Sequence, residues 1–74
     1  MNKELITTRL ISLRKEIGYT QYDLSVILNV SRSTISKYEK GFLIPSIDTI
    51  IQLADLYNVS CDYILCRTDT LINP

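Results

Sequence analysis

The sequence contains no histidine and no tryptophan, and it has only two cysteines, two glycines and two prolines. Without histidine, it lacks the side chain that most often acts as a general base or a metal ligand near neutral pH. The cysteines, Cys61 and Cys66, lie five positions apart, which fits neither a CxxC redox pair nor a zinc site. We therefore expect no metal ion, no cofactor and two reduced thiols that behave as small apolar side chains.

Other catalytic arrangements are missing as well. Gly18 and Gly41 are the only glycines, so there is no glycine-rich loop to hold a phosphate. No serine or cysteine has an obvious partner base. The carboxylates are scattered at predicted helix starts, where capping explains them. We expect that the protein is not an enzyme.

Long apolar runs are also absent. No stretch approaches the ~20 consecutive apolar residues that span a bilayer, and the N-terminus has no signal-peptide pattern. These features predict a cytoplasmic protein without a membrane partner.

What remains is a short chain of 74 residues, 46% of them hydrophobic, which is enough for one domain with a core. The scarcity of glycine and proline favours helices. We predict an all-α fold with five helices, the first at residues 2–17 and the fifth capped by Ser60. Ile6, Leu10, Leu13 and Ile17 form the predicted inner stripe of the first helix. Residues 1–66 form the predicted domain and residues 67–74 a C-terminal tail.

The organising stretch is residues 20–41. Thr20 and Asp23 predict a capping box that opens a short helix, whose inward residues are Leu24, Ile27 and Leu28. Asn29 tolerates the left-handed conformation that a tight turn requires. Ser31 then caps a third helix. Two short helices joined by such a turn predict a helix-turn-helix unit.

The third helix has two different faces. Ile35 and Tyr38 are spaced to point inward, and the opposite face is wholly polar. Its members are Arg32, Ser33, Ser36 and Lys37. Arginine suits bidentate contact with guanine, and short hydroxyls admit close approach of a large surface. We predict that this face meets DNA.

Charge is unevenly distributed although the net charge is zero. Residues 1–40 carry seven cations and four anions, whereas residues 41–74 carry one cation and four anions. Positive potential is thus predicted on the half that holds the third helix.

The segments RLISLRKEIGYTQYDLSVILNVSRSTISKYEKG and PSIDTIIQLADLYNVSCDYIL resemble the phage-repressor/Cro type of helix-turn-helix domain, the XRE family. The resemblance covers about three quarters of the chain. It implies a compact five-helix, lambda-repressor-like DNA-binding domain, whose third helix enters the major groove. Asn29 stands where the family usually has glycine in the turn, and Ser25 where it commonly has alanine.

The resemblance also implies roles for individual residues. Arg32, Ser33, Ser36 and Lys37 match positions that read base edges. Thr20, Gln21 and Lys40 match positions that contact phosphates or the DNA backbone. Arg14 and Glu39 match a buried ion pair between the first and third helices.

Surplus apolar residues indicate a further surface. Leu43, Ile44, Tyr63, Ile64, Leu71 and Ile72 exceed what a domain of this size needs in its core, and exposed apolar patches often mark interfaces. We predict that Tyr63, Ile64, Leu71 and Ile72 form a two-fold homodimer interface.

The predicted function is a sequence-specific regulator of transcription, a repressor that binds double-stranded DNA at a palindromic operator. Since the chain stops soon after the fifth helix, we expect a complete small regulator. Two alternatives stay open: an antitoxin or restriction–modification controller, and a protein-interaction module built on the same scaffold.

Overall fold

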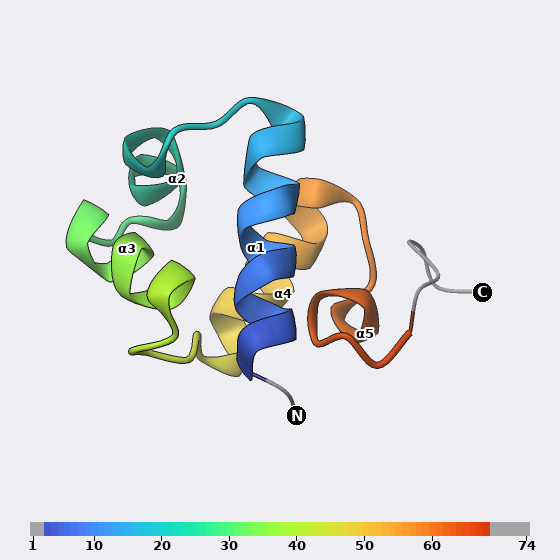
Figure 1. Ribbon diagram of the computed structural model, residues 1–74. Coiled ribbons are helices and arrows are strands. Elements are labelled where there is room, and N and C mark those ends of the chain that lie inside the picture. The colour runs from blue at the N-terminus through green and yellow to red at the C-terminus, as the bar shows by residue number, and fades with distance from the viewer. Residues whose placement is uncertain (1–2, 69–74) are drawn as a thin grey trace.

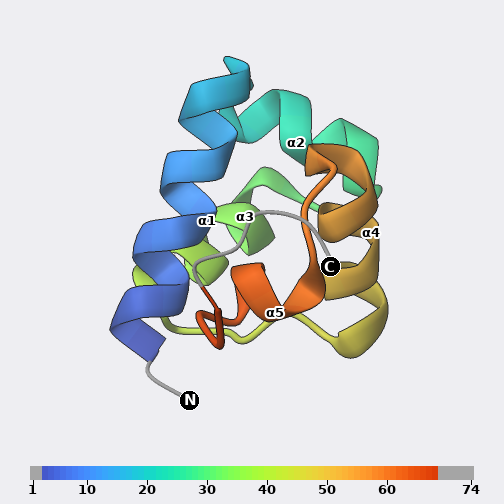
Figure 2. The same ribbon diagram turned by 90° about the vertical axis from the view of Figure 1, so that its right-hand side faces the viewer.

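The computed structural model describes residues 3–68, and within them every regular element is a helix. The helices are α1 (Lys3–Ile17), α2 (Gln21–Leu28), α3 (Arg32–Lys40), α4 (Ile47–Tyr57) and α5 (Cys61–Ile64). In Figure 1, α1 runs through the middle, with α3 on one side of it and α5 on the other, and in Figure 2, α5 lies in front while α1 runs along one edge of the molecule. The predicted all-α, five-helix fold is confirmed.

Side-chain caps determine where the helices begin. Thr20 and Asp23 form the predicted capping box: the Asp23 amide donates to Thr20 Oγ1 at 3.0 Å and the Thr20 amide donates to Asp23 Oδ2 at 2.9 Å. Ser31, Ser46 and Ser60 cap α3, α4 and α5, and each accepts a hydrogen bond from the backbone amide three residues later. Each cap satisfies an amide that the helix itself leaves without a partner.

Residues with a positive φ directly follow four of the helices, and the first of them is Gly18 (φ 94°) after α1. Asn29 (φ 56°) follows α2, Gly41 (φ 79°) follows α3, and Asn58 (φ 55°) follows α4. These residue types adopt a positive φ at the smallest steric cost. The turn between α2 and α3 is consequently only three residues long, and it holds the two helices in close contact, as predicted.

One continuous core joins all five helices. Its apolar members are Ile6, Leu10, Leu13, Leu24, Leu28, Ile35, Tyr38, Ile50, Leu53, Ala54, Tyr57 and Ile64. Ser25 is also buried, and its hydroxyl donates to the Tyr22 carbonyl oxygen at 2.6 Å. A serine therefore fits where α2 packs closely, because its polar group finds a partner within its own helix.

Two residues predicted to face inward, Ile17 and Ile27, are exposed instead. Ile17 lies in the last turn of α1, beyond the reach of the core, and Ile27 lies on the outer side of α2. Ile47 and Ile51 lie four residues apart on α4 and share an exposed face. The apolar face of α4 is therefore wider than the part of it that the core covers. Within residues 3–68, no helix combines the length and apolarity needed to cross a membrane.

Candidate nucleic-acid interface

The third helix separates apolar and polar side chains cleanly. Ile35 and Tyr38 are buried in the core. On the other side Arg32, Ser33 and Lys37 are exposed and Ser36 is half-buried. Among the described residues, no ion pair or side-chain hydrogen bond engages Arg32 or Lys37. Both cations are therefore available to an external ligand.

An ion pair behind this face ties α3 to α1. Arg14 Nε donates to Glu39 Oε2 at 2.6 Å, and an Arg14 terminal nitrogen donates to Glu39 Oε1 at 3.0 Å. The two side chains are only 11% and 8% exposed. Hydrogen bonding to Glu39 raises the pKa of Arg14 above its ordinary value. A bidentate pair of this kind fixes direction as well as distance, so it orients α3 against α1.

Two further contacts extend this pair. The other terminal nitrogen of Arg14 donates to the Tyr19 carbonyl oxygen at 2.9 Å, in the linker between α1 and α2. The Gln21 side-chain amide donates to Glu39 Oε1 at 3.0 Å. Glu39 thus joins α1, α2 and α3. The resemblance assigns Gln21 to phosphate contact, and sequence reasoning missed its inward contact, because spacing along one helix does not show which carboxylate it will meet.

Tyr57 of α4 lies beside this network without a hydrogen-bond partner for its hydroxyl among the described residues. Burial raises the pKa of Tyr57 to about 12, with smaller opposing effects from Arg14 and Glu39. The hydroxyl therefore stays neutral well above the ordinary pKa of tyrosine.

A shallow recess opens next to Arg32, at the start of α2. Its lining residues are Arg14, Tyr19, Thr20, Gln21, Tyr22 and Arg32. Tyr22 is 65% exposed at its rim, whereas the Thr20 hydroxyl is occupied by capping. Guanidinium, phenol and amide groups around the first turn of a helix form surroundings that suit an anion such as a phosphate. Lys40 is exposed at the other end of α3, next to Gly41.

The structure describes two of the four predicted dimer residues, Tyr63 and Ile64. Ile64 is completely buried in the monomer core, so the prediction that it lies at a dimer interface is wrong: it has no surface left to offer. Tyr63 is half-buried, and the Arg9 guanidinium lies over its ring at 4.0 Å from the centroid. Leu71 and Ile72 lie outside the described residues.

No group of three or more cysteine, aspartate and glutamate side chains within residues 3–68 is arranged to hold a metal ion. Cys61 and Cys66 are half-buried free thiols. The chemistry that this surface offers is that of cations, hydroxyls and amides, which suits the binding of phosphates and base edges.

Comparison with known proteins is consistent with this geometry. A helix-turn-helix family model matches residues 10–64. The HTH-type transcriptional regulator ImmR of Bacillus subtilis is 42% identical over 61 residues, which are 82% of this chain and 48% of the relative. The cryptic phage CTXphi transcriptional repressor RstR of Vibrio cholerae is 31% identical over 65 residues, 88% of this chain and 58% of the relative.

A shorter relative aligns along most of its length. The uncharacterized HTH-type transcriptional regulator YazB of Bacillus subtilis is 36% identical over 62 residues, 84% of this chain and 90% of the relative. By contrast, this chain spans about half the length of ImmR.

Proposed function

Because this chain belongs to the helix-turn-helix family, we propose that it is a sequence-specific regulator of transcription that binds double-stranded DNA through α3. It acts in the cytoplasm as a repressor, in the form of a homodimer on a palindromic operator, with residues 1–66 as its DNA-binding domain. The observation that carries the proposal is the exposed polar face of α3, which presents two cations without an ion-pair partner within residues 3–68, while the opposite face is held in the core.

Each residue of this face has a role that fits its chemistry. Arg32 lies at the first position of α3, the end that enters the major groove in helix-turn-helix complexes. Its guanidinium can donate two hydrogen bonds to the N7 and O6 acceptors of one guanine. Lys37 lies more than one turn further along and reads a neighbouring base. Ser33 and Ser36 are short enough to let the helix approach the base edges.

Phosphates are contacted on both sides of α3. The recess at the start of α2 receives one phosphate, with the backbone amides after Thr20 as donors. Because the Gln21 side chain donates to Glu39, we assign the phosphate contact of Gln21 to its backbone amide. Lys40 and the backbone at Gly41 contact a second phosphate. With zero net charge, few counterions are released, so the affinity should fall only moderately with salt.

Selection of bound sites from random double-stranded DNA tests the proposal directly. We expect a two-fold symmetric consensus with half-sites about one helical turn apart. On that site, Arg32→Ala should weaken binding roughly 5- to 150-fold and relax the preference at one base pair, as expected for loss of ~1–3 kcal/mol of discrimination.

Arg67→Ala is a matched control, because Arg67 is an exposed cation that follows α5, and α5 lies across α1 from α3 in Figure 1. It should bind as the wild type does. Equal affinity and unchanged site preference in Arg32→Ala would contradict the assignment of Arg32 to base readout.

A second candidate function is a protein-interaction module, such as an antitoxin, on the same scaffold. The zero net charge and the exposed apolar residues between α3 and α4 favour it. Binding to DNA that weakens with salt supports the first candidate, whereas salt-insensitive binding to a protein alone supports the second.

A further inference from the structure

The recess at the start of α2 contains more hydrogen-bond donors than it can offer to a ligand. Its lining residues are Arg14, Tyr19, Thr20, Gln21, Tyr22 and Arg32, and its volume is about 490 Å³. This volume is in the range of ordinary ligand sites, so a phosphate group with part of its sugar can enter. Which side chains can bind that phosphate depends on which donors are free.

Three of these side chains are turned towards the protein. Each side-chain nitrogen of Arg14 donates to Glu39 or to the Tyr19 carbonyl oxygen, and the Arg14 side chain is only 11% exposed. The Gln21 side-chain amide donates to Glu39 Oε1 at 3.0 Å. The Tyr19 side chain packs against the core. These residues shape the recess and hold the helices together, but they have little to offer to an incoming anion.

Tyr22 differs from them because its side chain is free. It is 65% exposed, and among the described residues no hydrogen bond engages its hydroxyl. Tyr22 is the second residue of α2. Side chains of a helix lean towards its N-terminal end, so the Tyr22 phenol extends past the first turn of α2 and over the recess.

The other two lining residues do not replace Tyr22. The Thr20 oxygen accepts the capping hydrogen bond from the Asp23 amide at 3.0 Å, which fixes it at the start of the helix. Thr20 therefore offers one hydroxyl hydrogen close to the backbone. Arg32 lies at the start of α3, and its guanidinium is already assigned to a guanine. Tyr22 is thus the side chain of α2 that can reach out from the surface to a phosphate.

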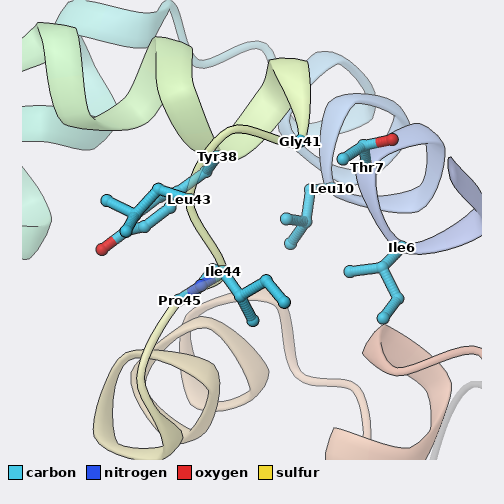
Figure 3. A pocket seen from close by; sticks show the side chains of 8 residues that line it. All are labelled: Ile6, Thr7, Leu10, Tyr38, Gly41, Leu43, Ile44 and Pro45. Atoms are coloured by element: carbon cyan, nitrogen blue, oxygen red, sulfur yellow. The ribbon is translucent and has the colours of Figure 1, made fainter. Parts of the chain in front are cut away.

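The hollow at the other end of α3 has a different chemistry. Figure 3 shows it between α1 and the loop after α3, where Ile6 and Leu10 face Ile44 across about 20 Å³. An apolar lining does not compensate an anion for the loss of its hydration. The recess at the start of α2, and not this hollow, therefore suits a phosphate.

We propose that Tyr22 is a DNA-contact residue whose hydroxyl donates a hydrogen bond to the phosphate in the recess and whose ring packs against the adjoining deoxyribose. Tyrosine is one of the side chains that donate to phosphate oxygens in protein–DNA complexes. The Tyr22 hydroxyl takes the role that the Gln21 side chain gives up by donating to Glu39. This contact rests on the proposed function, because it requires DNA bound through α3.

The contact positions α3 on the duplex and does not itself read a base. Tyr22 and Arg32 line one recess, so the phosphate that Tyr22 binds lies beside the base pair that Arg32 reads. Phosphate contacts fix register and orientation, whereas base contacts carry the sequence information. Because the phenol carries no positive charge, it displaces no counterion from the DNA, and its loss should leave the salt dependence of binding unchanged. Loss of Tyr22 thus differs from loss of Arg32, which changes base preference.

Affinities for the site selected from random DNA, measured by fluorescence anisotropy at several salt concentrations, test the contact. Tyr22→Phe removes only the hydroxyl and should weaken binding about tenfold at each salt concentration, as expected for a hydrogen bond to a charged group. Tyr22→Ala also removes the ring and should weaken binding further. Both variants should keep the base preference of the wild type. The unfolding free energy of Tyr22→Phe should equal that of the wild type, since the hydroxyl has no partner within residues 3–68.

Two controls match these variants. Val26→Ala corresponds to Tyr22→Ala, because Val26 is 62% exposed and lies one turn further along α2. Tyr63→Phe corresponds to Tyr22→Phe, because Tyr63 belongs to α5, which lies across α1 from α3 in Figure 1. Both controls should bind the site as the wild type does.

A set of duplexes, each with one phosphate replaced by a neutral methylphosphonate, identifies the phosphate itself. Replacement of the phosphate that Tyr22 binds should weaken binding by the wild type. It should weaken binding by Tyr22→Phe much less, because that variant already lacks the hydrogen bond. At every other phosphate the two proteins should lose affinity equally. Equal losses at all phosphates would overturn the assigned hydrogen bond.

The outcomes separate this contact from the proposed function. A Tyr22→Phe protein that binds the site as tightly as the wild type would overturn the hydrogen bond, while DNA binding through α3 would stand. A changed base preference in Tyr22→Phe would overturn the positioning role. A wild type that binds no DNA would overturn the proposed function and the Tyr22 contact with it.

Discussion

Removal of the Glu39 carboxylate should destabilise the fold more than any other single loss of charge among the described residues. The substitution Glu39→Ala leaves the Arg14 guanidinium in place with only the Tyr19 carbonyl as a partner, and it removes the acceptor of Gln21. Breaking a buried pair by deleting one partner costs ~3–5 kcal/mol, because the remaining charge is left desolvated.

The magnitude should lie at the low end of this range. Arg14 also lines the recess at the start of α2, where water can reach part of the guanidinium. We therefore expect a loss of about 3 kcal/mol in the free energy of unfolding. For a domain of this size that loss corresponds to a fall in Tm of roughly 12–24 °C. Because small domains hold ~0.05–0.15 kcal/mol per residue, it is a large share of the total stability.

Urea and thermal unfolding followed by circular dichroism measure this loss. Glu16→Ala is the control, because Glu16 is an exposed carboxylate on α1 and its removal should change stability by less than about 0.5 kcal/mol. The double variant Arg14→Met/Glu39→Leu should recover much of the lost stability, since an apolar pair does not strand a charge. A Glu39→Ala protein with the Tm of the wild type would refute this reasoning.

Three further predictions concern stability and use the same unfolding assay. Ser31→Ala removes the cap of α3 and should lower the free energy of unfolding by ~1 kcal/mol. Ser33→Ala is the control, because Ser33 is an exposed serine within α3 that caps no helix, and it should leave the free energy of unfolding nearly unchanged. Gly41→Ala should cost about 1 kcal/mol through its positive φ alone, because the added Cβ would meet only Thr7 at an ordinary 3.6 Å. Tyr57 has a folded pKa of about 12 against ~10 when unfolded. This raised pKa therefore contributes on the order of 2 kcal/mol to the free energy of unfolding. The contribution is complete below about pH 10 and is lost between about pH 10 and 12. Tyr57→Phe should remove this part of the pH dependence without lowering stability at pH 7, and an unchanged alkaline profile in that variant would contradict the assignment.

The sequence predicted the helices and turns well because their determinants are local. A cap acts within three residues, as with Thr20 and Asp23, and Asn29 needs only its own φ to end α2. The two faces of α3 follow from periodicity in the same way. The Arg14–Glu39 contact, in contrast, joins residues 25 positions apart, and only the family resemblance pointed to it.

Predictions of burial were weaker where they depended on neighbouring elements. Periodicity placed Ile17 and Ile27 inside, but both side chains are exposed. The surplus of apolar residues led us to place Ile64 at a dimer interface, although α5 is a single short turn whose one buried residue is Ile64. A pattern shows which side chains are apolar, but the surface available to cover them depends on how all five helices pack. The contact between the Gln21 side chain and Glu39 was not predicted, for the same reason.

The contacts that hold α3 in place lead to a test that separates base readout by Arg32 from the positioning of α3 by Glu39. A helix of nine residues is too short to be stable in isolation, so the orientation of its polar face depends on contacts made by its other side. Arg32→Ala should weaken DNA binding without changing the unfolding free energy, since Arg32 is exposed and unpaired among the described residues. Glu39→Gln keeps an acceptor for Arg14 but removes the charge, so it should lower both stability and affinity together. Measured at a temperature where both variants are fully folded, a loss of affinity in Glu39→Gln shows that the network orients α3. If Glu39→Gln then bound the selected site as tightly as the wild type, the network would serve stability alone, and the orientation of α3 would have to come from Ile35 and Tyr38.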